Sequence, residues 1–244
     1  MKTRLCLFSL IIGLALTANG ADEDLFAKAN KAYAEGRFGE AAANYESLIH
    51  GGKLNANLFY DLGNAWYRVG DFGQSILNYE RALALDPRHP EADANLRLAR
   101  DEARALELRR DWTERYASMA TVKQFTIAAA VAFWFALFMV THLFFSRRST
   151  GRIALIALCV IMGGVSIFAI VTLENGTHGD ALAIVTGKNV EARLATADNA
   201  KSVLVLPAGS EIKILSERGD WIYAALPNDQ RGWIPAANAQ RVRM

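Results

Sequence analysis

The sequence predicts a multidomain membrane protein that combines an α-helical solenoid, a two-helix transmembrane hairpin and a small all-β barrel. Three observations predict this arrangement: a 34-residue repeat near the N-terminus, two long apolar runs in the middle, and short alternating segments near the C-terminus. The 244 residues carry a formal net charge of +2, which is too small to indicate a nucleic-acid partner.

The first residues have the pattern of a secretory signal. Two basic residues precede an apolar core, Leu5–Leu16, and the small residues Ala18 and Gly20 follow at a spacing of two. We therefore predict a signal peptide over residues 1–20, cleaved after Gly20. The alternative is an uncleaved anchor, and in either case the chain that follows is exported.

Residues 22–89 contain two copies of a repeat, 22–55 and 56–89. The matching positions are Ala29 and Gly63, Asn30 and Asn64, Tyr33 and Tyr67, Gly36 and Gly70, Phe38 and Phe72, and Tyr45 and Tyr79. Two helices in 34 residues is the period of tetratricopeptide (TPR) repeats, and the second copy resembles that family most closely. The first copy departs from the motif at Lys28. We assign residues 22–118 to a TPR domain, with a capping helix over 90–110 because Arg97 replaces the motif's small residue.

The TPR resemblance implies a shallow concave groove lined by first-helix positions. Here these positions are Phe26, Asn30, Tyr33, Tyr60, Asn64, Tyr67 and Arg68. Asn30 and Asn64 resemble the asparagines that hold a peptide backbone in peptide-binding TPRs, because a carboxamide both donates and accepts hydrogen bonds. The lysines of the carboxylate-clamp subtype are missing, with Phe26 and Ala94 in such positions, so a C-terminal carboxylate is not the expected ligand. For the tyrosines, packing between helices is an equal alternative.

The middle of the chain predicts two membrane-spanning helices, Phe125–Phe145 and Ile153–Leu173. Each run has 21 residues, which at about 1.5 Å per residue spans the hydrocarbon core of a bilayer. The alternative is a pair of buried core helices. The loop 146–152 carries three arginines and no acid, which favours a cytoplasmic loop and places both flanking domains outside. Basic residues before the first run favour the opposite orientation, but acidic residues are interleaved with them and weaken that signal.

The mixed-charge segment 101–123, which precedes the first span, is expected to continue as a helix toward the membrane. His142 lies inside the first span, where a histidine is a functional candidate by default, although it can also reach the interface.

Residues 180–244 read as a small β domain of short strands separated by turn signals. The expected strands are Ala181–Thr186, Asn189–Leu194, Val203–Leu206, Glu211–Ser216, Trp221–Ala225 and Gly232–Pro235. The segments Val190–Arg193, Leu206–Ser210, Gly219–Trp221 and Gly232–Pro235 resemble the motifs of bacterial SH3-like domains. The resemblance implies a barrel in which Trp233 contributes to a peptide groove; core packing is the alternative for Trp233 and is favoured for Trp221.

No catalytic or metal-binding pattern appears in the sequence. The only cysteines are Cys6 and Cys159, of which the mature chain would keep one, and the four histidines are scattered. The sequence contains no Ser/His/Asp set, no paired-carboxylate motif and no phosphate loop. We therefore expect no enzyme, no cofactor and no metal.

The order of signal peptide, TPR domain, two-span hairpin and SH3-like domain resembles the E-type (Bat-type) proteins of bacterial aerotolerance operons. The resemblance implies a scaffold in the bacterial inner membrane, with both soluble domains periplasmic, that works beside von Willebrand-type and MoxR ATPase partners. Its role would be protein interaction in envelope or oxidative stress tolerance. The alternative function is a cell-wall sensor or tether whose SH3-like domain binds peptidoglycan peptides.

Overall fold

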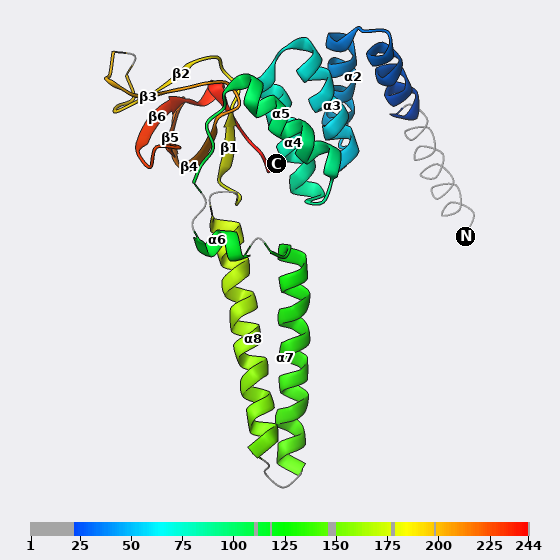
Figure 1. The fold of residues 1–244 in the computed structure, drawn as a ribbon, viewed down its shortest axis with the longest axis vertical. Helices are drawn as coiled ribbons and strands as arrows, with labels where there is room; N and C mark the ends of the chain where they lie inside the picture. The colour runs from blue at the N-terminus through cyan, green and yellow to red at the C-terminus, as the bar shows by residue number, and fades with distance from the viewer. Residues whose placement is uncertain are drawn as a thin grey trace, which may run out of the picture.

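A computed structural model describes residues 22–109, 112–117, 119–145, 150–176, 179–197 and 199–243. Helices and a β-sheet lie side by side in one head, and two long helices extend from beneath it (Figure 1). The signal peptide predicted over 1–20 and residues 146–149 of the predicted cytoplasmic loop lie outside the described residues.

The N-terminal half of the head is a helical repeat, as predicted. A helix at 22–34 is followed by α2 (Phe38–His50), α3 (Ala56–Val69), α4 (Phe72–Leu85) and α5 (Pro90–Ala103), and consecutive helices pack on one another. The side chain of Asn55 caps α3 by accepting from the Leu58 amide at 2.8 Å. Gly63 must be small, because a Cβ there would lie 2.7 Å from the ring of Tyr79 on α4.

The capping helix is shorter than the expected 90–110, and the expectation of a continuous helix over 101–123 is wrong. The α5 helix ends at Ala103, and Arg104 takes a left-handed conformation with φ 51°. The chain then runs without helical structure to residue 109, and a short helix, α6 (Trp112–Ala117), follows. The helix stops because the backbone of this linker is hydrogen-bonded to the sheet: the Glu211 amide donates to the Leu106 carbonyl at 2.8 Å.

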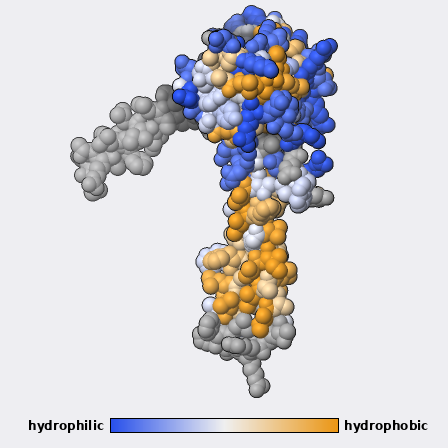
Figure 2. All heavy atoms as spheres, turned by 90° about the vertical axis from the view of Figure 1, so that its left-hand side faces the viewer, coloured by the Kyte–Doolittle hydropathy of each residue, from blue (hydrophilic) through white to orange (hydrophobic). Residues whose placement is uncertain are grey.

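Two long apolar helices, α7 (Val122–Phe145) and α8 (Thr150–Asn175), pack against each other below the head (Figure 1). Within them, Val122–His142 and Ile153–Asn175 are long and apolar enough to cross a membrane. Few of their side chains are buried in the protein, and Figure 2 shows their apolar surface below the hydrophilic head. The alternative of buried core helices does not fit this exposure.

The C-terminal segment forms an antiparallel sheet of seven strands. They are β1 (Leu182–Val185), β2 (Val190–Arg193), β3 (Ser202–Leu206), β4 (Glu211–Arg218), β5 (Trp221–Ala225), β6 (Arg231–Pro235) and β7 (Ala239–Arg241). Their order is β3-β2-β6-β5-β4-β1-β7, so β3 and β7 are edges and the sheet is open. The hydrogen bonding therefore does not describe the closed barrel that we predicted. The six expected strands are present, whereas the three-residue β7 was missed because it has no alternating pattern.

The helical repeat and the sheet share a hydrophobic core, although the hairpin separates them in sequence. Ile76 and Leu77 of α4 pack in one buried cluster with Leu182 and Ile184 of β1. Gly73 permits this approach, since a Cβ there would lie 2.9 Å from the carbonyl oxygen of Thr186. The segments before and after the hairpin thus form a single head, which the sequence did not predict.

Candidate functional site

The two asparagines predicted to face the groove have the same hydrogen-bonding environment in each repeat. The hydroxyl of Tyr45 donates to Asn30 Oδ1 at 2.6 Å, and that of Tyr79 donates to Asn64 Oδ1 at 2.7 Å. The Nδ2 of Asn95 also donates to Asn64 Oδ1, at 2.9 Å. Within the described residues, the Nδ2 groups of Asn30 and Asn64 donate to no protein atom. The arrangement thus fixes the carboxamide oxygens internally and leaves the two NH₂ groups as donors for a ligand.

Both tyrosine hydroxyls are protonated at neutral pH, as a tyrosine ordinarily is, and burial raises their pKa further. Burial, with a smaller contribution from the charge of Asp61, raises the pKa of Tyr45 to about 12. Burial also raises the pKa of Tyr79 further, although hydrogen bonds with Ser75 and Asn95 oppose it. The two phenols therefore remain donors at physiological pH and hold the asparagines in the same orientation.

The groove tyrosines of the two repeats also make the same contact. The ring of Tyr33 meets Phe38 edge-on with centroids 5.2 Å apart, and Tyr67 meets Phe72 in the same way at 5.5 Å. Each tyrosine is only partly buried and so has surface left for a ligand. Packing against these phenylalanines therefore covers part of each ring, and packing between helices stays an alternative to ligand binding.

Two further predicted positions, Arg68 and Phe26, contact aromatic rings of the first repeat. The guanidinium of Arg68 stacks 4.4 Å above the ring of Phe38, which ties the second repeat to the first. Phe26 contacts Tyr45 with centroids 6.0 Å apart and stays 37% exposed.

Around Tyr60 the structure adds polar residues that the sequence analysis missed. The ring of Tyr60 lies 4.9 Å from that of His89, and the Tyr60 hydroxyl accepts from Asn95 at 3.4 Å. His89 Nε2 is 3.2 Å from Asn57 Oδ1. Asn57 could have been found, because it is the second residue of the matched repeat and lies one helical turn before Tyr60 and two before Asn64. No comparable sequence signal marked Asn95, which is displaced from the repeat spacing.

On the sheet, Trp233 of β6 lies directly across from Tyr223 of β5. The two rings are 4.9 Å apart, and both residues are half-buried. Trp221, for which a core position was favoured, is also only half-buried. The Tyr223–Trp233 pair is a partly exposed aromatic surface on the sheet.

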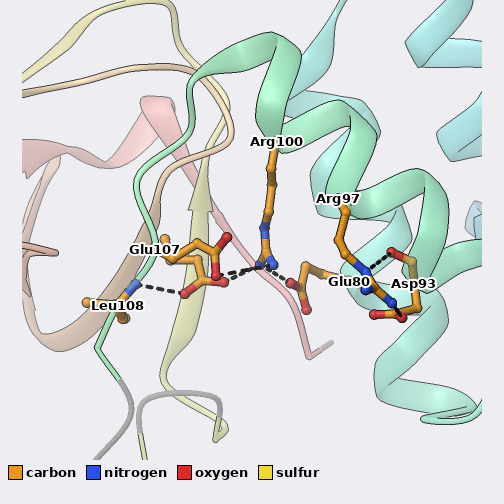
Figure 3. A network of polar contacts seen from close by, with 7 residues as sticks. Glu80, Asp93, Arg97, Arg100, Glu107 and Leu108 are labelled. Carbon is orange, nitrogen blue, oxygen red and sulfur yellow. Dashed lines mark hydrogen bonds and ion pairs between the residues drawn. The ribbon is translucent and has the colours of Figure 1, made fainter.

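Between the helices and the sheet, Arg100 lies among three carboxylates, of which Glu107 of the linker is the most distant at 3.7 Å (Figure 3). Its guanidinium contacts Glu80 of α4 at 2.5 Å and also contacts Glu211 of β4, whose side chain is fully buried. The second oxygen of Glu211 accepts from the Leu108 amide at 2.9 Å. Burial raises the pKa of Glu211 to about 7, although the charge of Arg100 opposes the shift. This network connects α4, α5, the linker and the sheet.

The described residues contain no group of three histidine, cysteine, aspartate or glutamate side chains placed to hold a metal ion. A family model described as a tetratricopeptide repeat matches residues 56–89, the second of the two predicted copies. Comparison with curated proteins gave no match. The helical half of the head therefore contains a repeat of a family that mediates protein interactions.

Proposed function

We propose that this protein is a membrane-anchored interaction scaffold whose TPR groove binds an extended segment of a partner protein. The observation that carries the proposal is the pair of asparagines, Asn30 and Asn64, one repeat apart. Their oxygens are held by Tyr45 and Tyr79, and their amide donors are left for a ligand. Amide donors at a repeated spacing suit the backbone carbonyls of an extended peptide. Hydrogen bonds to a peptide backbone do not depend on the identity of its side chains.

The proposed contact surface consists of first-helix positions of the two repeats. It comprises Phe26, Asn30, Tyr33, Tyr60, Asn64, Tyr67 and Arg68. The aromatic rings supply apolar contact area with little loss of side-chain freedom, because several are already braced by neighbouring rings. A TPR match to one repeat supports a protein partner over a small-molecule substrate.

The hairpin of α7 and α8 serves as the membrane anchor in this proposal. Large apolar side chains such as Trp134, Phe138 and Phe168 are each more than half exposed on it, and lipid would cover them. The arginines between the spans favour a cytoplasmic loop, so the head would stand on the periplasmic side of a bacterial inner membrane. The order of segments resembles the Bat-type proteins of aerotolerance operons, which suggests von Willebrand-type and MoxR-linked partners and a role in envelope or oxidative stress tolerance.

The sharpest test replaces both asparagines with aspartate. The double variant Asn30→Asp, Asn64→Asp keeps an oxygen to accept from each tyrosine but removes both amide donors and adds charges that repel carbonyl oxygens. Losing two hydrogen bonds at about 1 kcal/mol each should weaken partner binding by about thirtyfold or more. The measurement is crosslinked affinity purification of the full chain from membranes, with the partners identified and quantified by mass spectrometry.

The matched control is the double variant Asn199→Asp, Asn228→Asp, which adds the same two charges at exposed positions of the sheet domain. It should recover the wild-type partners in wild-type amounts. Equal partner recovery from the Asn30→Asp, Asn64→Asp variant and the wild type would contradict the groove proposal, provided that circular dichroism shows both to be folded.

A second candidate function rests on the aromatic pair of Tyr223 and Trp233. If the sheet acts as an SH3-like domain despite its open hydrogen bonding, this surface could hold peptidoglycan stem peptides, making the protein a cell-wall sensor or tether. The test is sedimentation of the detergent-solubilised full chain with purified sacculi. Binding that Trp233→Ala removes and the Asn30→Asp, Asn64→Asp variant retains would favour this function.

A further inference from the structure

We propose that the cleft between the head and the membrane hairpin binds the headgroup of an anionic phospholipid. The proposal rests on the membrane anchoring proposed above, but it does not depend on the partner groove.

The cleft lies where the aqueous head meets the apolar helices. It has a volume of about 720 Å³, within the range of ligand-binding clefts. Its upper wall comes from the end of α4 and the turn into α5, including Leu85 and Arg88. Its lower wall comes from the start of α7 and the end of α8, including Lys123 and Leu173. In a membrane-anchored protein this level coincides with the headgroup layer, because the candidate spans begin at Val122 and end at Asn175.

Four basic and three acidic side chains line the cleft, so their formal charges sum to +1. Arg100 is engaged by Glu80 and Glu211, Arg243 contacts Asp180 at 2.5 Å, and the lining acid Asp93 is held by Arg97. These pairs account for most of the charged groups at the site.

Two lining cations, Arg88 and Lys123, have no ion-pair partner among the described residues. The remaining lining acid is Glu114 on α6, whose carboxylate lies close to Gly176. The first turn of α7 contains no acid, and Thr121 and Gln124 cap it reciprocally, with amide-to-oxygen distances of 3.2 and 2.9 Å. The cleft therefore presents two cations beside the positive end of a helix dipole to a negatively charged group.

The apolar part of the wall favours a lipid over a free anion. Leu85 is 53% exposed and Met119 is 77% exposed, both beside the basic groups. A phospholipid satisfies both features at once, because its phosphate meets the cations while its glycerol backbone and first methylenes cover the apolar side chains. Inorganic phosphate would satisfy only the first.

The experiment is native mass spectrometry of the full chain in detergent, titrated with dioctanoyl phosphatidylglycerol or with dioctanoyl phosphatidylcholine. The wild type should retain phosphatidylglycerol preferentially. Each of Arg88→Gln and Lys123→Gln should weaken that retention by about fivefold, and the double variant by about twenty-fivefold. The charge-matched control is Arg218→Gln, on an exposed part of β4, which should leave retention unchanged.

Three results would overturn the proposal. Equal retention of the two lipids, or retention that the double variant leaves unchanged, would show that the cleft does not select an anionic headgroup. Displacement of the lipid by an equimolar amount of inorganic phosphate would show a plain anion site.

Carbonate extraction separates this proposal from the anchoring on which it rests. If alkaline carbonate releases the full chain from membranes, the anchoring fails and the lipid site fails with it. If the chain stays in the membrane but shows no preference for phosphatidylglycerol, the lipid proposal alone fails.

Discussion

Replacing Glu211 with glutamine should remove much of the pH dependence of the head's stability between about pH 4.5 and about pH 7. Burial raises the pKa of this carboxyl from 4.5 to about 7. Across that window the folded protein holds a proton that the unfolded chain has released. The stability contributed by the neutral carboxyl is therefore complete below about pH 4.5 and is lost as the pH rises through about 7.

The size of the effect follows from the two pKa values. They differ by about 2.5 pH units, and each unit is worth about 1.4 kcal/mol, so the full loss is about 3.5 kcal/mol. Glutamine resembles the neutral carboxyl and still offers an oxygen to the Leu108 amide. Wild type and Glu211→Gln should therefore be similarly stable near pH 5, with the variant more stable near pH 8.

The assay is denaturant unfolding of the full chain in detergent at both pH values, followed by the fluorescence of the tryptophans in the head. Burial also raises the pKa of Asp61, to about 6, so part of the wild-type decline should persist in the variant. The control Glu217→Gln removes an exposed charge at the far end of the same strand and should keep the wild-type decline. The reasoning is refuted if Glu211→Gln declines with pH as steeply as the wild type.

Two further substitutions test the packing of the head. Gly63→Ala should lower the free energy of unfolding by about 1–3 kcal/mol, because the new Cβ would overlap the Tyr79 ring. Thermal unfolding measures this loss, and Gly39→Ala, where nothing lies within 4 Å of the added atom, is the control. At pH 8, where Glu211 is ionised, Arg100→Met should destabilise the junction by about 3–5 kcal/mol, because Glu80 and Glu211 lose their shared cation. Faster proteolysis of the linker between α5 and α6 would show this destabilisation. If the linker of the variant resisted proteolysis as well as that of the wild type, Arg100 would not stabilise the junction.

Local features of the fold were predictable because their causes are local. The repeat spacing located α3 and α4, and Asn55, Gly63 and Gly70 have the conformations and contacts that a cap, a close approach and a turn require. Apolar runs located α7 and α8 for the same reason, since length and composition decide whether a helix can cross a bilayer.

The junction of the head was not predictable because its causes are distant in sequence. Arg100 and Glu211 are 111 positions apart, with the whole hairpin between them. The alternating pattern of β4 places Glu211 on a polar face, but the α5 helix and the linker cover that face. Likewise, the open edges of the sheet depend on which strands pair, and strand patterns alone do not determine pairing.

For the candidate groove, the repeat predicted positions but not their partners. Asn30 and Asn64 were identified as recurring amides, yet their hydrogen bonds with Tyr45 and Tyr79 were not considered. The signal was present, because each tyrosine follows its asparagine by 15 residues in both copies. Asn95 joins the site only through the packing of α5 on the second repeat.

The most direct test of groove binding is site-specific photocrosslinking in intact membranes. A photoreactive side chain would be placed at position 30, at position 64 or, as a reference, at the exposed position 217 of the sheet domain. Groove binding predicts the same crosslinked partner from positions 30 and 64 and none of it from 217. Crosslinking of the partner from position 217, with none from positions 30 and 64, would contradict groove binding.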